Sequence, residues 1–178
     1  MSTVKKLKLE ELNRIDIETF KEVQKTPLVV MLDDVRSMHN VGAVFRTADA
    51  FLIEKIVLCG ITPRPPHRDI HKAALGATES VDWEYAESSI EAVEKLKANG
   101  YKIVAVEQTT GSVEISDFRM DKDKKYALIL GNEVEGVSEQ LLPLCDAFIE
   151  IPQLGTKHSL NVSVCAGIAM WEFFKVLS

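Results

Sequence analysis

The stretch LVVMLDDVRSMHNVGAVFRTADAFLIEKIVLCG, residues 28–60, decides the fold of this chain. It opens with a short apolar run over 28–33, β-branched in the middle, which predicts a buried strand. Apolar residues at helical spacing follow over 40–51, and a second short apolar run covers 55–60. A strand, a helix and a strand in this order are typical of a parallel sheet whose crossover helices cover its faces.

The rest of the chain continues this alternation of short apolar strands and helices. Further strands are predicted at 81–87, 101–107, 126–131 and 147–152, and further helices at 88–100, 138–145 and 159–177. The Pro-rich basic segment 61–80 is predicted to be a long loop with one helical turn. The fold class that follows is α/β, with a mostly parallel sheet and helices on both faces.

The N-terminal residues form a separate part of the prediction. Residues 7–25 are predicted to be a short amphipathic helix that Pro27 stops. The apolar residues of this helix would be Leu9, Leu12, Ile15 and Phe20. We therefore interpret residues 1–27 as a helical extension and residues 28–178 as one domain.

Composition limits the class of protein. Apolar residues make up 46% of the 178 and charged residues 27%, as in ordinary soluble domains. We find no run of eighteen apolar residues and no signal-peptide pattern, so we expect a cytoplasmic protein without a membrane segment. Cys59, Cys145 and Cys165 are scattered in apolar runs without metal-ligand spacing, so we expect no metal site.

The charge pattern is mixed. A net charge of −6 argues against broad non-specific binding to nucleic acid. Basic residues nevertheless gather in two places, at 36–46 and 64–72. The second cluster is either a solvated surface or a set of phosphate contacts, and the sequence leaves both interpretations open.

The acidic loop GNEVEGVS, residues 131–138, follows a predicted strand. It spaces two glycines like a phosphate-binding loop but carries Glu133 and Glu135 in place of the Gly-Lys-Ser/Thr ending. Two carboxylates would repel a triphosphate, so a nucleotide-like cation without phosphate would suit this loop better. The alternative is a solvated turn whose glycines take positive φ.

Polar residues also stand at two predicted helix starts. Asn40, and Ser159 or Asn161, could each be a helix cap or part of a site. Arg46 lies among apolar residues, where an arginine is commonly an ion-pair partner or a side chain that extends its charge to solvent.

Three segments occur in a fixed order and spacing: DDVRSMHNVGAVFRTADAF (33–51), ALILGNEVEGVS (127–138) and IEIPQLGTKHSLNVSVCAGIAMWEF (149–173). Together they resemble the three signature motifs of the SpoU (TrmH-like) family of RNA ribose 2′-O-methyltransferases, within the SPOUT superfamily. The segment HKAALGATESV (71–81) resembles the family's intervening region. The likeness covers residues 28–177, nearly the whole chain.

The resemblance implies properties that the strand pattern does not show. It implies a SPOUT-type methyltransferase domain over 28–178 with a C-terminal trefoil knot, and a homodimer. The implied cofactor is S-adenosyl-L-methionine, and the implied reaction is methyl transfer to a ribose 2′-hydroxyl of RNA, with tRNA favoured over rRNA. The alternative is a non-catalytic SPOUT-like RNA-binding protein.

The resemblance also assigns roles to individual residues. The catalytic set would be Arg46, Asn40, Glu133, Ser159 and Asn161. The cofactor-binding set would be Glu107, Gln108, Thr109, Gly131, Asn132, Ile151 and Leu160. The RNA-contacting set comes from the two basic clusters and not from the resemblance; it would be Arg36, His39, Arg64, Arg68 and Lys72. A guanidinium stays protonated in proteins, so whether Arg46 is the general base or a phosphate clamp stays open.

Overall fold

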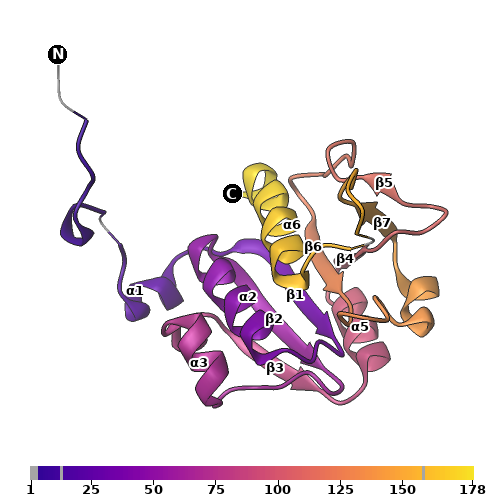
Figure 1. The fold of residues 1–178 in the computed structure, drawn as a ribbon, viewed down its shortest axis with the longest axis horizontal. Helices are drawn as coiled ribbons and strands as arrows, with labels where there is room; N and C mark the ends of the chain where they lie inside the picture. Colours follow the sequence, from indigo (N-terminus) through magenta and orange to yellow (C-terminus); the bar gives the residue numbers. More distant parts are fainter. Residues whose placement is uncertain (1–3, 13, 158) are drawn as a thin grey trace.

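A seven-stranded parallel sheet forms the centre of the molecule (Figure 1). The structure is a computed structural model that describes residues 4–12, 14–157 and 159–178. The strands are β1 (Thr26–Asp33), β2 (Ile53–Cys59), β3 (Trp83–Ala86), β4 (Tyr101–Val106), β5 (Val113–Glu114), β6 (Lys125–Leu130) and β7 (Ala147–Glu150). Their order in the sheet is β3-β2-β1-β6-β4-β7-β5, and each adjacent pair is parallel. The predicted fold class is thus confirmed.

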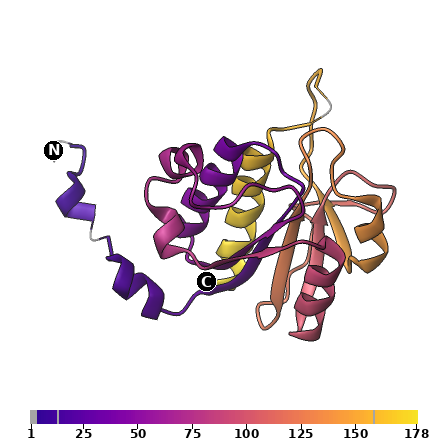
Figure 2. The same ribbon diagram turned by 90° about the horizontal axis from the view of Figure 1, so that it is seen from below.

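Helices cover both faces of this sheet (Figure 2). The α-helices are α1 (Ile17–Glu22), α2 (Met38–Ala50), α3 (Arg68–Ala74), α4 (Ala77–Ser80), α5 (Ser89–Ala98) and α6 (Val162–Leu177). Two 3₁₀ helices are η1 (Leu9–Leu12) and η2 (Glu139–Leu144). Core side chains of α2, α3, α4 and α6 pack on one face, and those of α5 and η2 pack on the other.

Strand β1 shows why the apolar runs become central strands. Its side chains alternate between the two cores: Leu28, Val30 and Leu32 join the α2 and α6 side, while Val29 and Met31 join the α5 side. A strand buried on both faces needs apolar residues at every position, which is the continuous run seen in the sequence.

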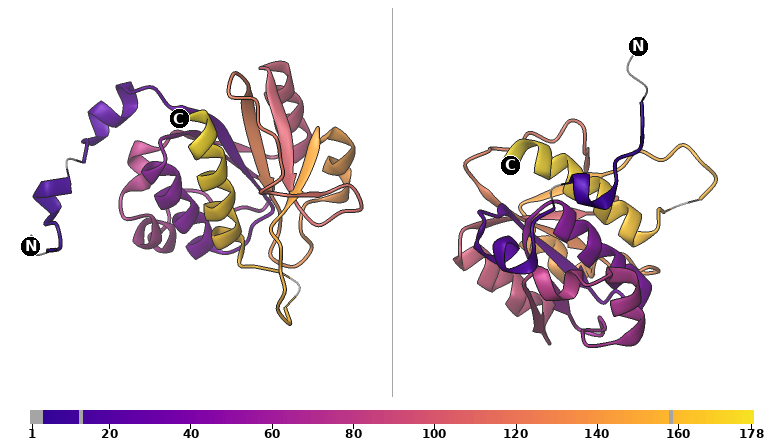
Figure 3. Two further views of the ribbon diagram at one scale, coloured as in Figure 1. Left: turned by 90° about the horizontal axis from the view of Figure 1, so that it is seen from above. Right: turned by 90° about the vertical axis from the view of Figure 1, so that its left-hand side faces the viewer.

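The predicted N-terminal helix over 7–25 is wrong in its extent. Two short helical segments, η1 and α1, replace it: η1 lies away from the body of the molecule, whereas α1 packs against α4 and brings Phe20 into the core (Figure 3). Asp16 accepts a hydrogen bond from Thr19 N and so begins α1 as a new helix. Phe20 is buried, but Leu12 and Ile15 are exposed because no core surface lies beside them. The division of the chain at residue 27 stays a prediction.

The predicted loop over 61–80 contains two helices, α3 and α4, instead of one turn. His67 caps α3 because its Nδ1 accepts a hydrogen bond from Asp69 N. Ile70 and Ala74 then face the core. Gly42 of α2 permits this packing, since a Cβ there would collide with Ile70 O and the Ala73 side chain.

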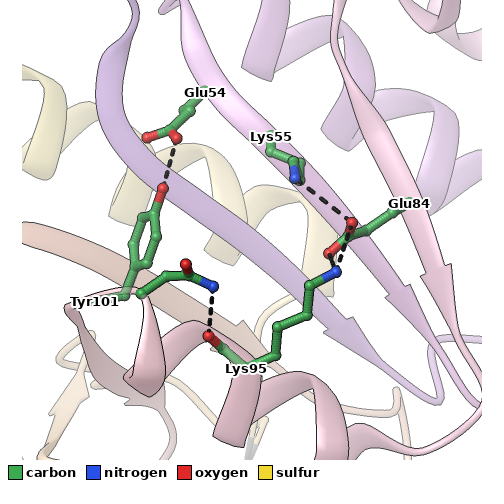
Figure 4. Close-up of polar contacts among 6 residues, drawn as sticks. Glu54, Lys55, Glu84, Lys95 and Tyr101 are labelled. Carbon is green, nitrogen blue, oxygen red and sulfur yellow. Dashed lines mark hydrogen bonds and ion pairs between the residues drawn. The ribbon is translucent and has the colours of Figure 1, made fainter.

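The α5 face carries polar contacts between strands and helix (Figure 4). The Glu84 carboxylate lies 3.5 Å from Lys55 Nζ and 3.2 Å from Lys95 Nζ, and the Tyr101 hydroxyl donates to Glu54. Exposed ion pairs of this kind add little stability. They do show which way β3 faces: Glu84 points toward α5, so its neighbours Trp83 and Tyr85 point toward the other face.

The described helices are all too short or too polar to cross a membrane. The longest of them, α6, has 16 residues and measures about 24 Å, below the roughly 30 Å of a bilayer core. The trefoil knot that the resemblance implies stays a prediction.

Candidate functional site

A cavity of about 460 Å³ lies where β4, β6 and β7 end and α6 begins. The carboxyl ends of parallel strands are the usual ligand-binding edge of such sheets. The lining consists of Val106, Glu107, Gln108, Leu130, Gly131, Asn132, Glu133, Val134, Glu135, Gly136, Glu150, Ile151, Gln153, Ser159, Leu160, Asn161, Val162 and Cys165. Three loops that are distant in sequence therefore form one site.

The acidic loop after β6 is a tight, internally bonded turn. Asn132 and Gly136 exchange two backbone hydrogen bonds of 2.9 and 3.0 Å. The Asn132 side chain accepts from Val134 N at 2.9 Å and donates to Asp34 O at 2.7 Å, which ties the loop to the end of β1. A Cβ at Gly131 would overlap the backbone of Gly136, so the turn requires glycine at position 131.

Glu107 connects this turn to the end of β4. Its carboxylate accepts hydrogen bonds from Gln108 N and Val137 N, both at 2.9 Å. Gly136 has a φ of 72°, and a Cβ there would collide with that carboxylate. Positive φ and the close carboxylate both demand glycine at this position.

A chain of side-chain hydrogen bonds joins the three sequence segments. Glu133 Oε1 accepts from Asn40 Nδ2 at 3.0 Å, and Asn40 Oδ1 accepts from Asn161 Nδ2 at 3.1 Å. Asn161 Oδ1 in turn accepts from Ser163 N at 2.9 Å and so caps α6. Asn40 is only 8% exposed, which makes these bonds costly to lose. The interpretation of Asn161 as a helix cap is confirmed, and the same side chain also lines the cavity.

Glu133 is held as a carboxylate. Burial raises its pKa, but hydrogen bonds from Arg36 N, Ser37 N and the Asn40 amide outweigh burial, and the pKa lies below its usual value. The charged side chain thus fixes the segment that leads into α2.

The lining of this cavity has an acidic part and an apolar part. Among the described lining residues are four glutamates and no basic residue. The apolar part contains Val106, Leu130, Val162 and Cys165. Burial raises the pKa of Cys165 to about 11, so its thiol stays neutral at pH 7. This combination disfavours a phosphate-bearing ligand and suits a cation with an apolar body.

Most residues of the predicted cofactor and catalytic sets lie in this cavity. Those in the lining are Glu107, Gln108, Gly131, Asn132, Glu133, Ile151, Ser159, Leu160 and Asn161. Asn40 lies behind the wall, bonded to Glu133 and Asn161. Thr109 lies outside the lining, in a turn where its N–H donates to Ser112 Oγ. The roles of these residues stay predictions.

Arg46 lies apart from the lining. It is exposed on α2 and takes part in none of the ion pairs of the described residues. The ion-pair explanation for this arginine therefore finds no partner in the part of the chain that the structure describes.

The predicted RNA-contacting residues lie in two groups. Arg36 and His39 are exposed at the start of α2, where the Arg36 backbone N–H donates to Glu133. Arg64, Arg68 and Lys72 are exposed on the 61–67 segment and α3. Within the described residues none of the five forms an ion pair.

Several lining residues were absent from the predicted set, although features of the sequence point to some of them. Val106, Leu130 and Glu150 are the last residues of β4, β6 and β7, so the rule that ligands bind at strand ends points to them. Glu135 stands in the acidic loop itself, and Cys165 lies one helical turn after Asn161. Within the described part of the chain, no group of three His, Cys, Asp or Glu residues is arranged to hold a metal ion.

Comparisons with known proteins agree with this geometry. The model of the SpoU rRNA Methylase family matches residues 27–171. A Staphylococcus aureus protein named as a TrmH family tRNA/rRNA methyltransferase is 30% identical over 87% of this chain and 61% of its own length. The AdoMet-bound rRNA methyltransferase from Sinorhizobium meliloti superposes with a TM-score of 0.79 at 30% identity, covering 89% of this chain and 60% of that one. The A. aeolicus TrmH/SpoU tRNA modifying enzyme superposes with a TM-score of 0.77 at 30% identity, covering 89% and 79%.

This chain spans about three fifths of the length of the curated relatives it matches. The family model nevertheless covers most of the chain, including all three hydrogen-bonded segments of the site. The chain belongs to the SpoU rRNA Methylase family.

Proposed function

We propose that this protein transfers a methyl group from S-adenosyl-L-methionine to a ribose 2′-hydroxyl of RNA. The observation that carries the proposal is the bonded chain Glu133–Asn40–Asn161, which brings together the three segments of family resemblance at one cavity. Family membership and the AdoMet-bound relative support the cofactor and the class of reaction.

The cavity residues fit this cofactor. S-adenosyl-L-methionine is a sulfonium cation without phosphate, and when bound it supplies a methyl group ready for displacement. The four glutamates favour a cation, and the apolar part of the lining accommodates a ring system. Nucleoside triphosphates would meet the same carboxylates and be repelled.

The chain's own residues position the acceptor. Displacement at a methyl group requires the attacking oxygen in line with the leaving group, so alignment accounts for much of the catalysis. Asn40 and Asn161 hold each other and fix the start of α6 against the start of α2. Arg46 lies on the same α2, where its protonated guanidinium can donate to the ribose oxygen or to a neighbouring phosphate.

We also propose a homodimer with the α2–α6 surface at its centre. Val164 and Trp171 of α6 are 52% and 46% exposed, which leaves large apolar side chains facing solvent. Trp171 lies 5.6 Å from the ring of Phe51, at the end of α2, so the two helices share this surface. Arg46 is exposed on α2 and would face the cofactor cavity of the second copy.

We propose tRNA as the substrate in preference to rRNA. The A. aeolicus relative is described as a tRNA modifying enzyme, whereas the Sinorhizobium relative is described as an rRNA methyltransferase. The assay therefore needs both classes of RNA.

Two measurements test the proposed function. Calorimetry should show binding of S-adenosyl-L-methionine and of its demethylated product, without comparable binding of ATP or NAD. Methyl transfer from labelled cofactor should occur with tRNA and stop when the target nucleotide carries 2′-deoxyribose. Equal affinity for ATP would contradict the cofactor assignment, and RNA binding without any methyl transfer would favour the non-catalytic alternative.

A further inference from the structure

A second cavity, of about 500 Å³, lies between the start of α3, α4 and the edge strand β3. Its walls include Pro66, His67, Arg68, His71, Glu79 and Trp83. No described residue lines both this cavity and the acidic one. Figure 1 shows α3 on the far side of α2 from α6, so the two cavities lie on opposite sides of that helix.

Trp83 gives this cavity an aromatic surface. The side chain is half-buried and packs on the core around α2, while also lining the cavity. Its orientation follows from β3, because Glu84 points toward Lys95 on the opposite face (Figure 4). The rings of Pro65 and Pro66 add further apolar wall. An indole ring fixed by the core and open on the cavity side is a surface on which a base can stack.

One arginine and two histidines lie around this aromatic surface. Arg68 and His71 are exposed, and neither forms an ion pair among residues 4–12, 14–157 and 159–178. His67 Nδ1 accepts a hydrogen bond from Asp69 N, which leaves Nε2 as the ring nitrogen that can donate to a ligand. In a chain with a net charge of −6, an unpaired arginine and two imidazole donors beside an aromatic ring suit an anionic ligand.

A neighbouring contact extends the same surface. The Arg64 guanidinium lies 4.2 Å from the centre of the Tyr85 ring, two residues along β3 from Trp83. The Tyr85 hydroxyl donates to Gly60 O at 2.9 Å, which fixes the ring. A guanidinium stacked on a held aromatic ring keeps its outer N–H donors free for a phosphate.

From these contacts we propose that the second cavity binds an unpaired nucleotide of the RNA substrate, with its base stacked on Trp83 and its phosphate bound by Arg68 and His71. This inference rests on the proposed function, because it names a further contact to the same RNA. Single-stranded RNA is recognised by such pairs of aromatic rings and cations.

Glu79 adds a preference among bases. It is the one acidic residue of the described lining, and a charged carboxylate can only accept hydrogen bonds. Bases with an exocyclic amino group donate to such an acceptor, whereas uracil has no amino group. The cavity therefore selects an amino-bearing base, and Glu79→Gln should narrow the difference between cytidine and uridine nucleotides.

Free nucleotides test the cavity without any methyl transfer. The chain has two tryptophans, so the Trp171→Phe variant leaves Trp83 as the only indole. Cytidine monophosphate should quench the Trp83 fluorescence saturably below about 10 mM, and inorganic phosphate should not. Absence of saturable quenching by all four nucleoside monophosphates, in a variant with wild-type circular dichroism, would overturn the proposal. Saturable quenching without any methyl transfer would support nucleotide binding in this cavity and contradict the proposed function.

Paired variants of the full chain extend the test to RNA. Trp83→Leu keeps apolar bulk but loses the stacking surface, so RNA affinity should fall by about 5- to 100-fold, while Trp83→Phe should stay within about threefold of wild type. Arg68→Ala should weaken RNA binding, and Lys122→Ala, an exposed lysine in the turn before β6, serves as its charge control. S-adenosyl-L-methionine binding should be unchanged in all four variants. Equal losses of RNA affinity in Trp83→Leu and Trp83→Phe would contradict the assignment. It would also be contradicted if a protein partner displaced the bound nucleotide and RNA did not.

Discussion

The two cavities differ in how their charged side chains are used. In the acidic cavity Glu107 and Glu133 are both bonded to backbone N–H groups, and Asn40 and Asn161 are bonded to each other. In the cavity beside Trp83, Arg68 and His71 have no ion-pair partners in the described chain. The side chains of the acidic cavity are held by internal hydrogen bonds before any ligand binds. Those of the second cavity are free to contact a ligand.

This difference indicates two kinds of recognition. A rigid acidic cavity places a small cation within tight limits, which suits a reaction that depends on alignment. Exposed, unpaired cations suit a large polyanion, whose binding is mainly electrostatic and sensitive to salt. Helix α2 connects the two, since it packs against α6 through Phe51 and against α3 at Gly42.

Arg46 on α2 should show the largest effect on activity. Arg46→Ala should lower methyl transfer by about a thousandfold, because it removes the donor that orients the ribose oxygen or a neighbouring phosphate. Cofactor affinity measured by calorimetry should stay unchanged, since Arg46 lies outside the acidic cavity. Arg46→Lys is the control that keeps the charge and loses the planar donor pair.

Subunit mixing tests whether Arg46 serves the partner's cavity. Inactive Arg46→Ala and Asn161→Ala chains are allowed to exchange subunits. Half of the molecules become heterodimers with one intact composite site, so activity should return to about a quarter of wild type. Confirmed exchange without recovered activity would place Arg46 and Asn161 in one chain's own site.

Gly131 tests the rigidity of the acidic cavity. Gly131→Ala forces a Cβ into the backbone of Gly136 and Val137, so the turn must move, at a cost of about 3 kcal/mol in unfolding free energy. S-adenosyl-L-methionine binding should weaken as the turn shifts. Gly155→Ala is the matched control, because a Cβ there meets no atom within 4 Å. Equal effects of the two substitutions in chemical denaturation and calorimetry would show that the turn is not fixed.

The sequence predicted the sheet well for a physical reason. Strands buried on both faces, such as the central parts of β1 and β6, carry continuous apolar runs, and such a run is visible in the sequence without knowledge of the strand's partners. Helices α3 and α4 were missed because their formation depends on partners distant in sequence. The glycine that admits α3, Gly42, lies on α2, and the local cap of α3 is the imidazole of His67, which is not one of the usual N-cap residues.

The sequence was sufficient to predict which loops form the site. It was not sufficient to predict the side-chain hydrogen bonds between them. Loops at the ends of β4, β6 and β7 follow from the strand pattern, and nine predicted residues line the cavity there. The contact between Asn40 and Asn161 spans 121 positions of sequence, so no local pattern reveals it. The role of Trp83 could not be predicted either, because its cavity forms only when α3 and α4 pack beside β3.

Glu133 should make the stability of the acidic cavity depend on pH. Its folded-state pKa lies below the unfolded-state value, so its contribution is fully present above pH 4.5 and is lost as the pH falls through the folded-state pKa. Glu133→Gln should lower the unfolding free energy at pH 7 by about 1.5 kcal/mol and remove this part of the acid dependence. Glu135→Gln, in the same loop but exposed, should stay within about 0.5 kcal/mol of wild type in urea denaturation. The same acid dependence in Glu133→Gln and wild type would contradict a structural role for the carboxylate.

The smallest expected effect concerns the basic surface as a whole. If Arg64, Arg68 and Lys72 each contact an RNA phosphate, replacing all three with alanine should lower the slope of log affinity against log salt by about two, because fewer counterions are released. The matched control replaces Lys102, Lys122 and Lys124, which are also exposed and likewise form no ion pair in the described chain. Net charge changes equally in both triple variants, so a general electrostatic effect would alter both slopes. A change confined to the first variant, with cofactor binding intact, would assign the phosphate contacts to this surface. Unchanged slopes in both would show that the 64–72 cluster is a solvated surface and that its unpaired cations do not reflect recognition.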